Sequence, residues 1–122
     1  MTLDEILEAT EAEQLVAPPF NMDVESACAS DLMSDVLVFT KSNMVLVTGL
    51  TNPQAIRTAD MAEAPLVIFV RGKYPPQETL KLAEEMGIAV LLTGYTMFET
   101  AGLLYQSGLK GLGKLPTIRQ EH

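Results

Sequence analysis

Residues that commonly build catalytic and metal-binding sites are scarce in this sequence. It contains one cysteine, Cys28, one histidine, His122, and no tryptophan. Metal and iron–sulfur sites take three or four soft ligands, which is more than one Cys and one His supply. A nucleophilic Ser or Cys needs a tunable base beside it, and a histidine at the last residue is poorly placed for that role. We therefore expect no metal, no cofactor and no hydrolytic triad.

Basic residues are also scarce. Eight Lys and Arg residues against 16 Asp and Glu residues give a formal net charge of −8. Nucleic-acid backbones and anionic membrane surfaces both attract clustered Lys and Arg, so the composition argues against either as a partner. No apolar run approaches the roughly 20 residues of a membrane-spanning helix, and the N-terminus lacks a signal-peptide pattern. We expect a cytoplasmic protein that binds neither nucleic acid nor membrane.

The sequence is organised around NMVLVTGLTNPQAIRT, residues 43–58, in which a strand feeds a helix. The apolar run Met44–Val47 has the composition of a buried strand, and a short Thr- and Gly-containing loop follows it. Asn52 is a favoured N-cap, and Pro53 suits the first helical position because the amide that it lacks would be unpaired there. A strand followed by a helix is the building block of a parallel sheet.

The same unit recurs twice along the chain. The apolar runs 65–70 and 88–92 each precede an expected helix, and runs that are apolar on both faces suit strands covered from both sides. A capping-box helix over residues 3–10 and a short strand over 14–17 come first. We predict a single small α/β domain, whose mainly parallel sheet of about four or five strands is flanked by helices.

Polar residues follow the expected strands. Parallel sheets bind ligands beyond the carboxyl ends of their strands, and the helices that begin there offer unpaired amides to an anion. The candidate ligand-binding residues at these exits are Ser30, Asp31, Ser34, Asp35, Thr48, Thr51, Asn52, Arg71, Thr93 and Thr96. They predict a site for a small anionic ligand, and a set of ordinary strand-to-helix turns is the alternative interpretation.

The segment from residue 23 to residue 40 is harder to assign. Val24–Ala29 fits a strand, after which Ser30 or Asp31 is expected to cap a short helix that turns Leu32 inward. On that helix the SDxxSD pattern would form one polar face. Capping and solvation alone are the more common explanation of such a pattern.

The end of the chain contains a further expected helix and a glycine-rich stretch. The helix Met97–Gln106 is predicted to bury Phe98, Ala101, Leu104 and Tyr105. The stretch GLKGLGK at 108–114 follows a helix and lacks the GxxxxGK[ST] pattern of a phosphate loop. We therefore expect a domain over 1–109 and a flexible C-terminal tail over 110–122.

Three segments resemble the DRTGG domain family. They are ASDLMSDVL at 29–37, the strand VLVTGL, and PLVIFVRGKYPPQETLKLAEEMGIAVLLTGYTMFETAGLLYQSGL at 65–109. The resemblance implies a regulatory or ligand-binding α/β module, as in some phosphotransacetylases and beside CBS domains. It also implies a fold similar to the N-terminal domain of HPr kinase/phosphorylase. Stand-alone members are often encoded with iron-only hydrogenase components, which implies a hydrogenase or another redox protein as partner.

The sequence departs from the two motifs that give the family its name. Thr51-Asn52-Pro53 stands where the family has Asp-Arg-Thr, and Val70-Arg71-Gly72 stands where it has Thr-Gly-Gly. A ligand contact made by the family's charged pair is therefore not carried over to these positions.

Three functions are compatible with these features. The first is a non-catalytic sensing or adaptor module that binds a nucleotide or a phosphorylated metabolite. The second is an interaction protein, as a homodimer or on a hydrogenase-type assembly, with Met22, Met33 and Met97 as candidate surface residues; methionines more often fill a core. The third is a phosphotransfer enzyme related to HPr kinase, which the missing phosphate loop makes the weakest of the three.

Overall fold

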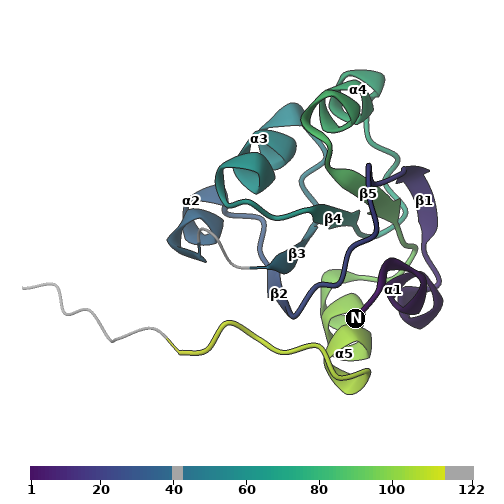
Figure 1. The fold of residues 1–122 in the computed structure, drawn as a ribbon, viewed down its shortest axis with the longest axis vertical. Helices are drawn as coiled ribbons and strands as arrows, with labels where there is room; N and C mark the ends of the chain where they lie inside the picture. Colours follow the sequence, from purple (N-terminus) through teal and green to yellow (C-terminus); the bar gives the residue numbers. More distant parts are fainter. Residues whose placement is uncertain (40–42, 115–122) are drawn as a thin grey trace, which may run out of the picture.

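A computed structural model describes residues 1–39 and 43–114, which form a five-stranded sheet between two layers of helices (Figure 1). The strands are β1 (Glu13–Val16), β2 (Ser26–Ala29), β3 (Met44–Thr48), β4 (Leu66–Phe69) and β5 (Ala89–Leu92). Their order across the sheet is β1-β5-β4-β3-β2. Strands β2 to β5 run parallel, and β1 pairs antiparallel with β5. The predicted fold class is confirmed.

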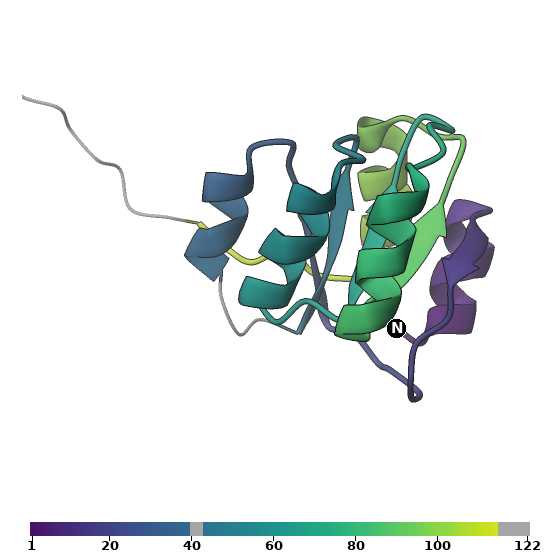
Figure 2. The same ribbon diagram turned by 90° about the horizontal axis from the view of Figure 1, so that it is seen from above.

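The helices are α1 (Leu3–Thr10), α2 (Met33–Val36), α3 (Pro53–Met61), α4 (Gln77–Met86) and α5 (Met97–Gln106), and the 3-10 turn η1 (Leu37–Phe39) follows α2. Helices α2, α3 and α4 cover one face of the sheet, and α1 and α5 cover the other (Figure 2). All residues of β3, β4 and β5 are consequently buried, which explains their nearly continuous apolar sequences.

The two apolar layers follow from the alternation of side chains along a strand. In β4, Val67 and Phe69 pack beneath α3 and α4, whereas Leu66 and Ile68 pack on the side of α1 and α5. All four side chains are fully buried. The sheet is therefore the middle layer of a three-layer domain.

Helix ends are specified locally, as the sequence predicts. The Thr2 hydroxyl accepts the N–H of Glu5, and the Glu5 carboxylate accepts the N–H of Thr2, so the expected capping box is present. Asn52 caps α3 directly before Pro53. Gly87 ends α4 in the left-handed conformation, with φ of 70°.

The predicted burial of Phe98 and Tyr105 in α5 is wrong. Their side chains are 87% and 75% exposed. The buried face of α5 instead contains Thr100 and Leu104, and the Thr100 hydroxyl donates to the Thr96 carbonyl. A threonine can be buried in a helix because its hydroxyl can donate to a carbonyl of the preceding turn. The prediction placed only apolar residues on the buried face of α5 and therefore missed Thr100.

The predicted N-cap of α2 is also wrong. The helix begins at Met33, and Leu32 at the cap position makes no side-chain hydrogen bond. Leu32 is 58% exposed, contrary to the expectation that it turns inward. Ser30 instead accepts the N–H of Leu32, and Asp31 bonds to the loop after β3. Since both residues precede the helix, the SDxxSD pattern does not form one helical face.

The chain after α5 returns to the free edge of β2. The Lys110 N–H donates to the Glu25 carbonyl, and the Lys110 carbonyl accepts the N–H of Ala27. Leu109, next to it, is buried. Most of the expected flexible tail, residues 115–122, lies outside the described residues.

Replacement of the first N-cap, Thr2→Ala, should lower the free energy of unfolding by about 1 kcal/mol, because the Glu5 N–H in the first turn of α1 loses the hydroxyl that accepts it. Urea denaturation measures the change. Gln54→Ala on the exposed surface of α3 is the control, with an expected change within about 0.5 kcal/mol. Equal losses in both variants would contradict the role given to the cap.

Candidate functional site

The carboxyl ends of four parallel strands meet at one edge of the sheet. Backbone hydrogen bonds continue past the strand ends, from Ser30 N–H to the Val47 carbonyl (3.0 Å) and from Thr93 N–H to the Phe69 carbonyl (3.0 Å). We call this surface the strand-exit edge and define it by residues 30–31, 48–52, 70–74 and 93–96. The predicted, mainly parallel arrangement is confirmed: β3, β4 and β5 lie side by side with a common direction, and β2 joins them.

Asp31 connects the first two strand exits. Its Oδ1 accepts the hydroxyl of Thr48 at 2.9 Å and the backbone N–H of Gly49 at 2.7 Å. The Thr48 side chain is fully buried, and its oxygen in turn accepts the N–H of Leu50 at 3.1 Å. Hydrogen bonds to a charged carboxylate are among the stronger ones in proteins, so Asp31 holds the loop after β3 in place.

Arg71 connects the next two exits. It has a positive φ of 63°, and its N–H donates to the Tyr95 carbonyl at 2.7 Å. Gly72, also at positive φ, donates its N–H to the Thr93 carbonyl at 2.9 Å. The loops after β4 and β5 are therefore bonded to each other through their backbones.

The Arg71 side chain lies over Gly49. A Cβ atom built on Gly49 would be 3.1 Å from Nη2 of Arg71 and 3.6 Å from Oδ1 of Asp31, so a glycine leaves space for the guanidinium. Among the described residues, Met1 and Asp23 form the single ion pair within 4.0 Å, so no carboxylate there lies within that distance of Arg71. Asp31, Thr48 and Arg71 are thus brought together, with an exposed positive charge at the surface.

Four other predicted site residues take part in structural hydrogen bonds. Asn52 and Thr96 cap α3 and α5 with their side chains. The Thr51 carbonyl accepts the hydroxyl of Thr79, and the buried Thr93 hydroxyl donates to the Thr10 carbonyl at 2.7 Å. Asn52 and Thr96 remain exposed at the strand-exit edge, whereas the Thr93 side chain is directed into the fold.

The side chains of the remaining three predicted residues make no hydrogen bond to Asp31, Thr48 or Arg71 within the described part of the chain. Ser30 turns back to Leu32 through its hydroxyl. Ser34 and Asp35 lie on the exposed surface of α2, and no hydrogen bond within the described ranges connects their side chains to Arg71 or Thr48. The structure therefore separates the two Ser-Asp pairs that the sequence suggested as one face.

Glu11 and Tyr95 were missed by the sequence analysis. They line an open cavity of about 280 Å³ with Thr93 and Gly94 at the end of β5. The Tyr95 hydroxyl donates to Glu11, and this hydrogen bond and the Glu11 charge raise the pKa of Tyr95. Glu11 arrives from the end of α1 because β1 pairs with β5, a pairing that no local pattern indicates.

Cys28 is buried in β2. Burial raises the pKa of its thiol, and the nearby charge of Asp35 raises it further. In residues 1–39 and 43–114, no three His, Cys, Asp or Glu side chains are grouped as a metal site would require. None of the helices in the described part of the chain has the length and apolar character needed to span a membrane.

Comparison with known proteins identifies a matching domain family and a solved structure with a similar fold. The sequence profile of the DRTGG domain matches residues 5–107, and no curated protein matches the sequence. A similar solved structure contains the CBS and DRTGG domains of the regulatory region of Clostridium perfringens pyrophosphatase, complexed with its activator diadenosine tetraphosphate. The TM-score is 0.67 at 19% identity, and the match covers 87% of this chain and 46% of that chain. This chain thus spans about half the length of that region, and the likeness shows the fold.

Thr93→Val should lower the free energy of unfolding by about 1–3 kcal/mol, because the buried Thr10 carbonyl loses its hydrogen-bond donor. Chemical denaturation measures the loss. Thr51→Val is the matched control, since its bond to Thr79 is made by the backbone carbonyl and survives the substitution. A Thr93→Val protein as stable as the control would contradict the structural role of this hydroxyl.

Cys28 should react slowly with a thiol reagent at pH 8 in the folded protein. Burial keeps the thiol protonated and inaccessible, so labelling should be at least about tenfold slower than in the denatured chain. Timed alkylation followed by mass spectrometry gives both rates. Equal rates would show that the thiol is exposed and available for chemistry.

Proposed function

The chain belongs to the DRTGG domain family, and on that basis we propose that it is a regulatory module that binds a small anionic ligand at the strand-exit edge. The ligand class is a nucleotide or a phosphorylated metabolite. The observation that supports this most directly is the exposed Arg71 guanidinium, which lies over Gly49 where parallel strands end. In open α/β sheets this edge is the usual position of a ligand.

The surroundings of Arg71 favour an anion. Helices α3 and α5 begin at this edge, after Asn52 and Thr96, and their first turns present amides and the positive end of the helix dipole. A guanidinium binds two phosphate oxygens at once, which adds geometric selectivity to the charge. Lys73 in the same loop is exposed and adds a second positive charge.

Asp31 is proposed to support the site by positioning it. Its bonds to Thr48 and Gly49 fix the loop on which the Arg71 side chain lies. Because its carboxylate is close to the same surface, it also disfavours a ligand that places negative charge on that side. Asp31 therefore sets the position of the loop and restricts the orientation of the ligand.

Catalysis is not part of the proposal. The hydroxyl groups nearest to the strand ends already donate elsewhere, Thr48 to Asp31 and Thr93 to the Thr10 carbonyl. A phosphotransfer reaction would need one of them to be released and activated by a base. Steady ATP turnover by the purified chain would contradict this part of the proposal.

An association role is the second candidate, and the exposed aromatic residues of α5 favour it. Met22, Met33 and Met97, the candidate surface residues of this hypothesis, pack against the core, which is the more common role of methionine. A second copy of the chain and a hydrogenase or another redox protein are the proposed partners. We take the protein to act in the cytoplasm, where a lone cysteine stays reduced.

A thermal-shift screen with AMP, ADP, ATP, diadenosine tetraphosphate and sugar phosphates tests the ligand site. A ligand at 100 times its Kd stabilises the folded state by about 2.7 kcal/mol and raises Tm. Arg71→Ala should abolish the shift, and Arg71→Lys should keep part of it. Arg57→Ala, which removes the same charge from the exposed surface of α3, should keep all of it. Equal responses of Arg71→Ala and Arg57→Ala, or no shift with any compound, would refute the proposed site.

A further inference from the structure

Helix α5 is apolar on two opposite faces. Its inner face, with Leu104, packs on the sheet, and its outer face presents Phe98 and Tyr105 to solvent. Glu99 is the single charged residue of α5, whereas α4, of the same length, has four. Large apolar side chains that gather on an exposed helix face often mark a contact surface, so the outer face of α5 has the composition of one.

Gly102 lies on this outer face, between the two aromatic residues. A Cβ atom added there would meet no atom within 4 Å. Phe98, Gly102 and Tyr105 follow one another at the i, i+4, i+7 spacing and form one stripe along the helix. Glycine weakens a helix interior relative to alanine, and the described contacts of the chain do not require it here. A glycine between two exposed aromatics leaves room for another backbone to approach.

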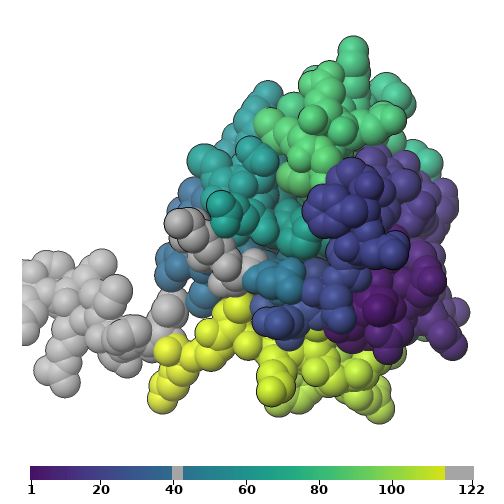
Figure 3. Space-filling view, in the orientation of Figure 1, coloured from purple at the N-terminus to yellow at the C-terminus, as the bar shows by residue number. Residues whose placement is uncertain are grey.

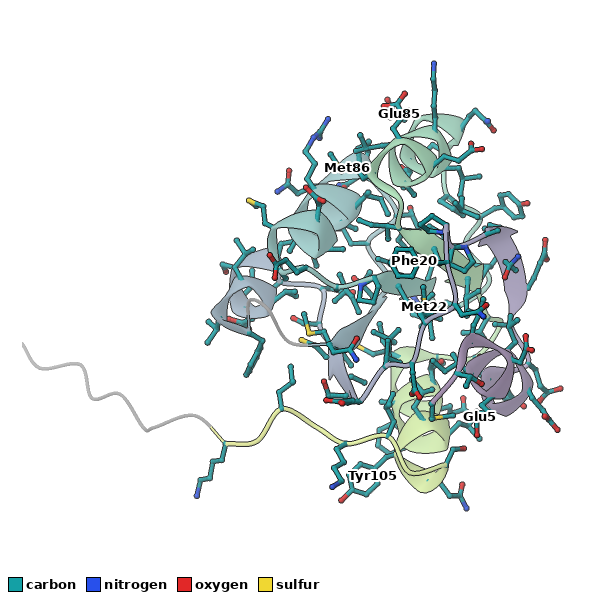
Figure 4. The ribbon with its side chains drawn as sticks, in the orientation of Figure 1. Glu5, Phe20, Met22, Glu85, Met86 and Tyr105 are labelled. Carbon is teal, nitrogen blue, oxygen red and sulfur yellow. The ribbon has the colours of Figure 1, made fainter. Side chains whose placement is uncertain are left out.

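The two flanks of α5 differ in charge. Toward α1, a hollow of about 320 Å³ is lined by Glu5, Glu8 and Ser107. Toward β2, an apolar hollow of about 170 Å³ is bordered by Tyr105 and Lys110. In Figure 3, α1 (purple) and the C-terminal segment (yellow) both lie along the lower part of the molecule. In Figure 4, Glu5 lies on one side of α5 and Tyr105 on the other. The aromatic stripe therefore has an acidic border and a basic border.

From these features we infer that the outer face of α5 docks a second copy of this chain, with the two α5 helices parallel. A two-fold axis along the helices brings each aromatic stripe against its counterpart, and it places Lys110 of each copy opposite Glu5 and Glu8 of the other. An antiparallel arrangement would instead bring the two acidic borders together. The inference rests on the association role proposed above and names its partner, surface and geometry.

Light scattering coupled to size-exclusion chromatography of the full chain tests the surface. The wild-type protein should have twice the mass of one chain, and Phe98→Glu should weaken the dimer by about 30-fold or more, because it places a charge at the centre of the apolar contact. Phe20→Glu is the matched control, since Phe20 is 67% exposed but is not on α5. It should leave the dimer intact.

The variant Gly102→Ala distinguishes an effect on packing between the two α5 helices from an effect on the stability of the fold. In the Phe98→Glu background, where the chain is monomeric, alanine should raise Tm by about 2–4 °C, because it is the better helix former. In the otherwise wild-type chain it should weaken the dimer, because the added methyl group keeps the helices apart. An unchanged dimer affinity with the raised Tm would contradict close helix packing at Gly102.

A charge exchange tests the parallel geometry. Glu8→Lys and Lys110→Glu should each weaken the dimer by severalfold, and the double variant should restore most of the wild-type affinity, because the pair is re-formed with its signs exchanged. If the losses of dimerisation free energy in the two single variants simply add up in the double variant, the parallel arrangement is wrong.

A wild-type chain that remains monomeric at every concentration, or a dimer that survives Phe98→Glu, would overturn the docking surface and leave α5 to a different partner or without one. The ligand site is tested separately by the same proteins. Phe98→Glu should retain the ligand-dependent rise in Tm, and Arg71→Ala should retain the dimer. Failure of one proposal is therefore distinguishable from failure of the other.

Discussion

The common direction of strands β2 to β5 is the constraint on which the rest of the structure depends. Because these strands run parallel, four chain segments distant in sequence end at the same edge, where their loops bond to one another. Asp31 joins the first pair of loops, and Arg71 joins the second pair and extends over Gly49. A reversed strand would remove one loop from this edge and break the sequence of contacts.

Much of the fold could be predicted because its signals are local. The capping box at Thr2, the Asn52-Pro53 helix start and the left-handed Gly87 depend on neighbouring residues alone, and all three are present. The direction in which Phe98 points was predicted wrongly, since the buried face of α5 depends on which elements lie beneath it. The partner of Asp31 is 18 residues away at Gly49, so its role required the sheet order as well as the sequence.

In the candidate site, too, features set by local sequence were predicted and features set by long-range contacts were not. The sequence correctly indicated the loops that meet at the strand-exit edge, because parallel βα units direct their exits to one side. It did not indicate which side chains would remain available there. The Thr93 hydroxyl is used inside the fold, whereas Glu11 enters the neighbourhood of Tyr95 only because β1 pairs with β5. Long-range pairing decides these outcomes.

The central claim is that an anionic ligand binds at the strand-exit edge beside Arg71. A titration of isotope-labelled protein with a nucleotide, followed by amide NMR spectra, tests it most directly. The account predicts saturable shifts confined to the loops of this edge, with the largest at the amides of Gly49, Arg71 and Gly72, which lie within or against those loops. Saturable shifts centred on another surface, or none at millimolar ligand, would contradict it.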